Sequence, residues 1–172
     1  MKIYIVKETS ADEKRVALVP DVAKKFIKDG FNIFLEKDAG HLSKFTDEDY
    51  SSLGVNIDNQ QENISDADVI FCVRIPDDNT INKIKSGACL IGLLNPYDNK
   101  EKLELLSKKG INAFSMELIP RSPRAQSMDV LSSQSNLAGY KAVINSASLY
   151  NKAMPMMMTA AGTVAPAKVF VL

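Results

Sequence analysis

The sequence contains few of the residues that most often mark a metal or catalytic site. It has no Trp, one histidine (His41) and two cysteines (Cys72 and Cys89). Neither C-x-x-C nor H-x-x-x-H occurs, which excludes a zinc site of the usual spacing. A single histidine without a G-x-S-x-G motif gives no basis for a Ser-His-Asp triad, so we interpret His41 as a solvated loop residue. Both cysteines lie in strand-like apolar runs, which predicts buried free thiols in a reducing compartment.

Glycine-rich phosphate-binding motifs are also absent. No two of the eight glycines are separated by a single residue, so the chain has no G-x-G-x-x-G turn, and it has no Walker-type loop. Four glycines instead end helical patterns, and each is followed by an apolar run: Gly30, Gly54, Gly87 and Gly110. Glycine is the usual residue just after a helix, so this spacing indicates helices that lead into strands.

The charge of the chain excludes several classes of partner. Lys and Arg number 21, as do Asp and Glu, and neither a basic arm nor an acidic tail is present. Nucleic acid and anionic membranes are therefore poor partner candidates. The start MKIYIVKE lacks the apolar core of a signal peptide, and no apolar run reaches the roughly 18 residues of a membrane span. We expect a cytosolic chain without direct membrane insertion.

Apolar runs and amphipathic segments alternate over the first 118 residues. The runs predict strands at 2–6, 32–37, 68–74, 88–94 and 112–118, and the amphipathic segments predict helices at 20–30, 46–54, 79–87 and 99–110. Such alternation is typical of βαβ units. It predicts an α/β fold with an open, mainly parallel, Rossmann-like (flavodoxin-like) sheet and helices on both faces, followed by a long helix from about Ser127 to Asn151.

The predicted long helix has a polar stripe made of Asp129, Ser132, Ser133, Asn136 and Tyr140. At about 100° per residue, these side chains fall within an arc of roughly 100°. A solvent-facing helix side usually has Lys and Glu, which favour helix. Short polar side chains suit a cleft that a ligand or a second domain approaches. A structural role, in which the stripe satisfies the backbone of another loop, fits the pattern equally well.

Two arginines follow predicted strands. Arg15 lies between the first strand and the first helix, and Arg74 ends the strand at 68–74. Open α/β sheets bind ligands at the carboxyl ends of their strands, where a guanidinium can hold a carboxylate or phosphate. The alternative is that both are surface charges, with Arg15 in a loop of charged neighbours that includes Glu13.

Two long stretches resemble a known family. RAQSMDVLSSQSNLAGYKAV (124–143) and MPMMMTAAGTVAPAKVFVL (154–172) are similar to the α subunit of proton-translocating NAD(P) transhydrogenase and, more broadly, to the alanine dehydrogenase/transhydrogenase superfamily. KETSADEKRVALVP (7–20) and the DAG before His41 match as well, so the resemblance spans the whole chain. It implies that residues 1–151 form the N-terminal α/β domain, including its long helix. Residues 152–172 would be the connector and first strand of a truncated NAD-binding Rossmann domain.

The resemblance also implies a site. Arg121, Gln126 and Asp129 match the catalytic residues of the family, and these three together with Ser132 and Tyr140 match its NAD(H)-binding residues; no metal is implied. Gln126 would reach toward the second nicotinamide. The cofactors implied are NAD(H) in the full-length subunit and NADP(H) on a partner subunit.

The activity implied is hydride transfer between NAD(H) and NADP(H), coupled to proton translocation. Partners would be the membrane-embedded and NADP(H)-binding subunits, and the full subunit would be a homodimer. The protein would then be cytoplasmic and peripheral to the inner membrane through its partners. This chain alone is expected to be inactive and to bind NADH weakly.

The residues also discriminate within the superfamily. Alanine dehydrogenases use an Arg in the N-terminal motif, a Lys after a middle strand and a His after the next strand. Arg15 matches the first, but Arg74 replaces the Lys, and NPYDN (95–99) contains no histidine. A guanidinium is a poor proton acceptor, whereas hydride transfer between two nicotinamides requires close positioning and no base. Transhydrogenase is therefore favoured, with an amino-acid dehydrogenase domain and a non-catalytic binding domain as alternatives.

Overall fold

Two units make up the fold, one over Met1–Met128 and one that begins at Asp129. The computed structural model describes residues 1–171, and Leu172 lies outside the described residues. The first unit contains a six-stranded sheet, and the second contains a long helix and a two-stranded ribbon. Each unit is described by itself below.

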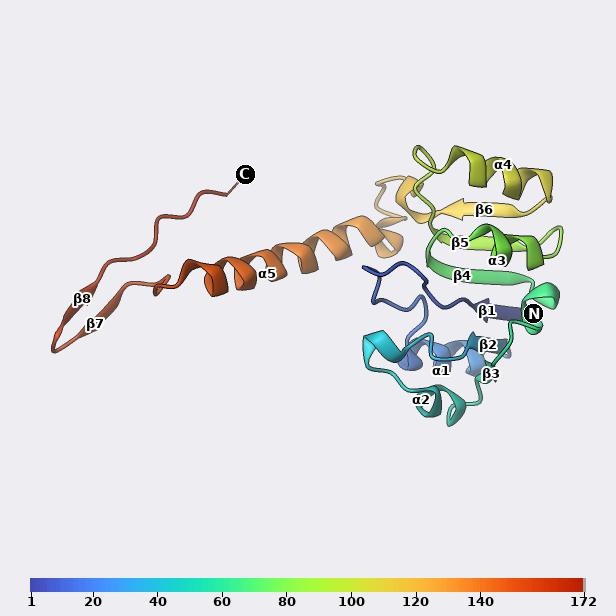
Figure 1. Cartoon of the computed structure of the whole chain (residues 1–172), viewed down its shortest axis with the longest axis horizontal. Coiled ribbons are helices and arrows are strands. Elements are labelled where there is room, and N and C mark those ends of the chain that lie inside the picture. The colour runs from blue at the N-terminus through green and yellow to red at the C-terminus, as the bar shows by residue number, and fades with distance from the viewer. Residues whose placement is uncertain (172) are drawn as a thin grey trace. The chain divides into compact units, whose positions relative to one another are not determined.

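The sheet of the first unit is parallel throughout. Its strands are β1 (Lys2–Ile5), β2 (Asn32–Glu36), β3 (Asn56–Asp58), β4 (Val69–Arg74), β5 (Cys89–Leu93) and β6 (Asn112–Ser115). They lie in the order β3-β2-β1-β4-β5-β6 (Figure 1). The predicted fold class is confirmed, and the order is that of the Rossmann type rather than the flavodoxin type of doubly wound sheet. The order reverses between β1 and β4, which is where ligands bind in such sheets.

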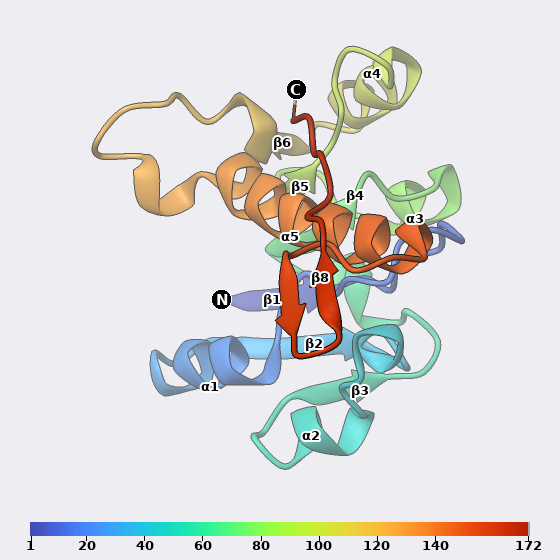
Figure 2. The ribbon, with the colours of Figure 1, turned by 90° about the vertical axis from the view of Figure 1, so that its left-hand side faces the viewer.

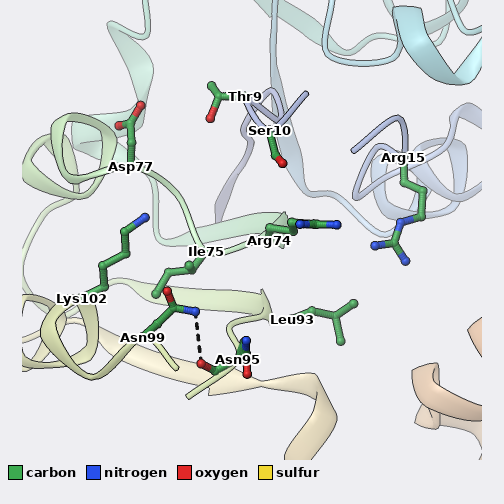
Figure 3. A pocket seen from close by; sticks show the side chains of 10 residues that line it. All are labelled: Thr9, Ser10, Arg15, Arg74, Ile75, Asp77, Leu93, Asn95, Asn99 and Lys102. Atoms are coloured by element: carbon green, nitrogen blue, oxygen red, sulfur yellow. Dashed lines mark hydrogen bonds between the residues drawn. The ribbon is translucent and has the colours of Figure 1, made fainter. Parts of the chain in front are cut away.

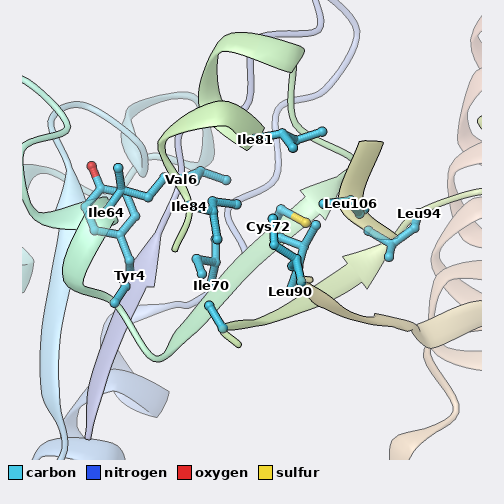
Figure 4. Close-up of a cluster of buried hydrophobic side chains, with 13 residues drawn as sticks. Tyr4, Val6, Ile64, Ile70, Cys72, Ile81, Ile84, Leu90, Leu94 and Leu106 are labelled. Carbon is cyan, nitrogen blue, oxygen red and sulfur yellow. The ribbon is translucent and has the colours of Figure 1, made fainter. Parts of the chain in front are cut away.

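Helices cover both faces of this sheet. They are α1 (Pro20–Lys28), α2 (Asp47–Ser51), α3 (Asp78–Lys83) and α4 (Lys100–Lys108). Because side chains alternate along a strand, Ile3 and Ile5 of β1 join a core with residues of α1 and α2. Tyr4 joins the opposite core, which includes Ile81 of α3 and Leu106 of α4 (Figure 4). The predicted arrangement with helices on both faces is confirmed.

Local sequence signals account for the helix ends. Pro20 occupies the first turn of α1, and Gly30 has a φ of +85° just after it. Thr46 and Asp49 form a reciprocal capping box at the start of α2. At α3, the side chain of Asp77 accepts a hydrogen bond from the backbone N–H of Thr80. The same signals supported the sequence-based prediction of these helices.

Three boundaries differ from the predicted ones. Strand β3 was not predicted, because three residues at the edge of the sheet are too few to show a period. Strand β6 ends at Ser115, and Met116–Leu118 form a 3-10 turn, η3, where the strand was predicted to continue. The long helix α5 (Val130–Tyr150) begins three residues later than predicted, because the side chain of Asp129 caps it by accepting from the N–H of Ser132.

The second unit continues beyond α5 with a hairpin. Asn151, with a φ of 54°, ends the helix. Strands β7 (Met157–Thr159) and β8 (Gly162–Val164) then pair antiparallel (Figure 2). Residues 169–171 belong to no strand, although a strand was predicted at 169–172. Among residues 1–171, no helix combines the length and apolar character needed to cross a membrane.

The close approach of β4 and β5 generates a stability prediction. A Cβ added at Gly92 would lie 2.5 Å from both the carbonyl oxygen and Sγ of Cys72. Since both atoms belong to a hydrogen-bonded neighbouring strand, we expect Gly92→Ala to lower the free energy of unfolding by about 1–3 kcal/mol. The measurement is urea denaturation. Gly139→Ala is the control, because nothing lies within 4 Å of that Cβ; equal stability of the two variants would contradict the prediction.

Candidate functional site

A crevice opens at the carboxyl ends of β1, β4 and β5. Its volume is about 440 Å³. It is lined by Thr9, Ser10, Arg15, Arg74, Ile75, Asp77, Leu93, Asn95, Asn99 and Lys102 (Figure 3). This is the point where the strand order reverses, as expected for a ligand site in a doubly wound sheet. The structure therefore brings together the two arginines that the sequence singled out, Arg15 and Arg74.

One buried carboxylate joins these two arginines. Glu13 is 3% exposed. Its Oε1 accepts from Nε of Arg15 at 2.7 Å, and its Oε2 accepts from the terminal nitrogen NH2 of Arg15 at 2.7 Å. The same Oε2 accepts from Nε of Arg74 at 3.0 Å. The arginine side chains themselves are 41% and 52% exposed. The sequence interpretation of Glu13 as a surface charge is wrong, because the carboxylate is the shared centre of the cluster.

The cluster has a stable charge state. Hydrogen bonds from the Arg15 side chain lower the pKa of Glu13 to about 2, outweighing the opposite effect of burial. The hydrogen bond to Glu13 raises the pKa of Arg15 in turn. Both arginines therefore remain cations at neutral pH, and neither serves as a proton acceptor. The cluster is suited to electrostatics and positioning.

A second carboxylate ties the loop after β1 to the end of β4. Glu8 Oε1 accepts from the N–H of Val73 at 2.6 Å, and its Oε2 accepts from the N–H of Arg74 at 3.1 Å. The pairing of β4 with β5 shifts register between Phe71 and Arg74, and Glu8 accepts from two N–H groups of that segment. Burial raises the pKa of Glu8 in spite of these bonds. Nothing in the local sequence pattern pointed to this contact.

A third carboxylate holds the end of β5. Glu117, in η3, accepts from the N–H of Leu94 through Oε2 at 3.2 Å and from the N–H of Asn95 through Oε1. Burial alone acts to raise the pKa of Glu117, but hydrogen bonds, including those two, together hold the pKa below its ordinary value. The carboxylate therefore stays ionised at neutral pH. Sequence reasoning missed this residue as well.

Two of the predicted site residues lie in the first unit, in the segment that follows η3. Arg121 is exposed in an irregular loop. Gln126 begins the 3-10 turn η4 (Gln126–Met128) and is exposed, directly after Ala125, which is buried. Both side chains are accessible to a ligand.

The other three predicted residues lie on α5 or at its start, and the structure brings two of them together. Ser132 donates its hydroxyl to Oδ2 of Asp129 at 2.6 Å and its N–H to Oδ1 at 3.0 Å. Ser133 donates its hydroxyl to the carbonyl of Asp129 at 3.2 Å. Tyr140 lies further along the helix and is 69% exposed. Asp129 thus both caps the helix and orients the hydroxyl of Ser132.

The remaining candidates from the sequence lie away from the crevice. His41 is exposed at the start of the 3-10 turn η1 (His41–Ser43), as expected for a loop histidine. Cys72 is a buried free thiol, as predicted, whereas the free thiol of Cys89 is only partly buried. Over residues 1–171, no group of His, Cys, Asp and Glu side chains is arranged to hold a metal ion.

Comparison with known families extends this description. The family model of the alanine dehydrogenase/PNT N-terminal domain matches residues 4–138. The chain belongs to this family. The match covers the parallel sheet, the crevice, the loop with Arg121 and Gln126, and the first half of α5, so the predicted membership is confirmed.

Individual relatives give the same result. The first portion of the NAD(P) transhydrogenase subunit alpha of Rickettsia prowazekii is 46% identical over 178 residues, covering 100% of this chain and 46% of the relative. A crystal structure of transhydrogenase from Sinorhizobium meliloti is 44% identical with a TM-score of 0.92, covering 97% of this chain and 50% of that one. Alanine dehydrogenase 1 of Staphylococcus aureus is 29% identical over 144 residues, covering 84% of this chain and 38% of the relative. The chain therefore spans about half the length, or less, of these relatives.

The Glu13 cluster generates a prediction that depends on pH. Because the pKa of Glu13 in the folded state, about 2, lies below its ordinary value of 4.5, its stabilisation is present above pH 4.5 and is lost as the pH falls toward 2. We expect Glu13→Gln to lower the free energy of unfolding by about 1–3 kcal/mol at pH 7. The difference from wild type should shrink between pH 4.5 and 3.

Urea denaturation at several pH values measures this difference. Asp12→Asn is the matched control, because Asp12 is an exposed neighbouring carboxylate, and it should change stability by less than about 0.5 kcal/mol. A Glu13→Gln effect that is constant from pH 7 to pH 3 would show that the ion cluster does not contribute as described.

Proposed function

We propose that this chain is the N-terminal part of the NAD(H)-binding α subunit of an NAD(P) transhydrogenase. The complete complex would transfer hydride between NAD(H) and NADP(H) and couple the transfer to proton translocation. The relatives from Rickettsia prowazekii and Sinorhizobium meliloti, at 46% and 44% identity, support this proposal. The alanine dehydrogenase of Staphylococcus aureus is a more distant match, at 29% identity.

The observation that carries the choice of reaction is the ion cluster in the crevice. Oxidation of an amino acid requires a group that accepts a proton. The crevice instead presents Arg15 and Arg74, both bound to Glu13, and a guanidinium does not exchange protons at neutral pH. Direct hydride transfer requires only that two nicotinamide rings be held face to face at short range. The cluster is compatible with that task, in which the protein positions the rings and performs no acid–base step.

The residues at the start of α5 fit the carboxamide of a nicotinamide. Asp129 and Ser132 share a hydrogen bond of 2.6 Å, which leaves the hydroxyl oxygen of Ser132 able to accept from an amide N–H. The nicotinamide supplies the hydride when NAD(H) is bound. In the proposal, Asp129 and Ser132 orient the ring through its carboxamide, and Tyr140 lines the rear of the cleft or a closing loop. Arg121 helps to hold the nucleotide end of the site, and Gln126 faces the second nicotinamide.

The rest of the assembly belongs to the same proposal. NADP(H) would be carried by a partner subunit, and other partners would be embedded in the membrane, which places this chain at the cytoplasmic side of the inner membrane. The full subunit would form a homodimer. Residues 1–151 would be its N-terminal domain, and residues 152–172 would lead into the NAD-binding Rossmann domain. The 172 residues alone would not catalyse transfer.

An amino-acid dehydrogenase is the second candidate, because the matching family includes alanine dehydrogenases. The two functions give different results in one assay of the complete protein. Production of NADH that depends on L-alanine would identify the dehydrogenase. Reduction of an NADP⁺ analogue by NADH without an amino acid would identify the transhydrogenase.

The proposal predicts a specific role for Gln126. In the complete complex, Gln126→Asn should slow hydride transfer at least about tenfold while the affinity for NADH changes little, because a shorter side chain misplaces the second ring without removing a contact to the first. Stopped-flow measurement of transfer, together with NADH titration, tests this. Gln60→Asn is the control at an exposed glutamine of the first unit. Transfer at the wild-type rate in Gln126→Asn would leave this residue with a structural role only.

A further inference from the structure

The loop that carries Arg121 and Gln126 has little backbone structure of its own. Its backbone hydrogen bonds, over the described residues, are short-range: the N–H of Ser122 donates to Pro120 at 2.9 Å, and the N–H of Ala125 donates to Ser122 at 3.0 Å. Arg121 and Gln126 themselves are exposed. Local turns of this kind do not fix a loop relative to a sheet. Its position must depend on contacts at its two ends.

Glu117 provides the contact at the first end. Its carboxylate lies in η3 and accepts hydrogen bonds from the N–H groups of Leu94 and Asn95, one on each oxygen. Two bonds on two oxygens fix the orientation of a carboxylate as well as its position. The hydrogen-bonded form is the ionised one, and the lowered pKa of Glu117 keeps that form throughout the neutral range.

The receiving end of this contact is rigid. Leu94 is fully buried in the core on the α3–α4 face of the sheet (Figure 4). Asn95 has a left-handed φ of 46°, a conformation that asparagine tolerates. The side chain of Asn99 donates to the carbonyls of both Leu94 and Asn95, at 3.0 and 3.1 Å (Figure 3 shows the second bond). Glu117 therefore binds a segment that the core and α4 already hold in place.

We propose that Glu117 is a positioning residue that fixes the loop of Arg121 and Gln126 to the end of β5, and so sets the rate of hydride transfer. This rests on the proposed function for the reaction itself. The tether is short, because Arg121 follows Glu117 by four residues and Gln126 by nine. Buried Ala125, 6% exposed, holds the far end of the same loop. Release of Glu117 leaves Ala125 as the remaining anchor, and displacements of about 1 Å reduce rates as much as 10²-fold.

Glu117→Gln is the sharpest test of this contact. An amide offers one acceptor oxygen and one NH2 group, so one of the two backbone N–H groups would face a donor. The size of the side chain is unchanged. Glu117→Asp keeps both acceptor oxygens but is shorter by one methylene, so it should retain more of the contact. Glu101→Gln is the matched control, because it makes the same change at an exposed position of α4.

The first measurement is limited trypsin digestion of the 172-residue chain, followed by mass spectrometry of the cuts after Arg121 and Arg124. Proteolysis of a loop reports its local opening. We expect these two cuts to be at least about fivefold faster in Glu117→Gln than in wild type or Glu101→Gln, with Glu117→Asp between, while cuts elsewhere are unchanged. Equal cutting rates in all four proteins would overturn the proposal. This result does not depend on any catalytic activity.

The second measurement is hydride transfer in the complete complex with each substitution in the full-length subunit. We expect the transfer rate at saturating nucleotide to fall about tenfold in Glu117→Gln and less in Glu117→Asp, with NADH affinity and thermal unfolding close to wild type. The loss should be constant between pH 6 and 8. Faster cutting with an unchanged transfer rate would overturn the positioning role. Absence of transfer in the wild-type complex would refute the proposed function, and the positioning role with it, while the digestion result would still stand for the contact.

Discussion

Backbone N–H groups at the carboxyl edge of a parallel sheet need acceptors, and acidic side chains supply them here. Glu36 of β2 accepts from Lys7, Glu8 accepts from the end of β4, and Glu117 accepts from the segment after β5. An unpaired, buried N–H costs about 1–3 kcal/mol, so each of these contacts fixes a loop to a neighbouring strand. The edge that binds ligands in such folds is thereby held in one arrangement. The crevice and the loop with Gln126 depend on these carboxylates for their positions.

Glu13 differs from these carboxylates because its partners are cations. It accepts from the guanidiniums of Arg15 and Arg74, one in the loop after β1 and one at the end of β4. A buried charge is tolerated only when it is paired and hydrogen-bonded, and Glu13 meets this condition through both arginines. The cluster therefore joins the two strands at which the sheet reverses its order. In the proposed reaction it serves as a fixed wall of the site.

The fold could be predicted from the sequence because its signals are local. Helix-ending glycines, the Thr46–Asp49 capping box and the apolar runs act over a few residues. The contacts of the site are not local: Glu8 meets Val73 across 65 residues, and Glu13 meets Arg74 across 61. Periodicity carries no information about such pairs. The residues proposed at the nicotinamide came from resemblance to a family, and the structure adds that Asp129 and Ser132 are already hydrogen-bonded.

The charge state of the Glu13 cluster has a consequence for proton coupling. The carboxyl titrates only near pH 2, and its two guanidinium partners stay protonated far above neutral pH. These three groups therefore neither take up nor release a proton under physiological conditions, and the electric field that they produce is constant. A transhydrogenase that responds to a proton gradient receives nothing of that signal through this cluster. The signal has to arrive as a mechanical displacement, from subunits whose own groups do titrate.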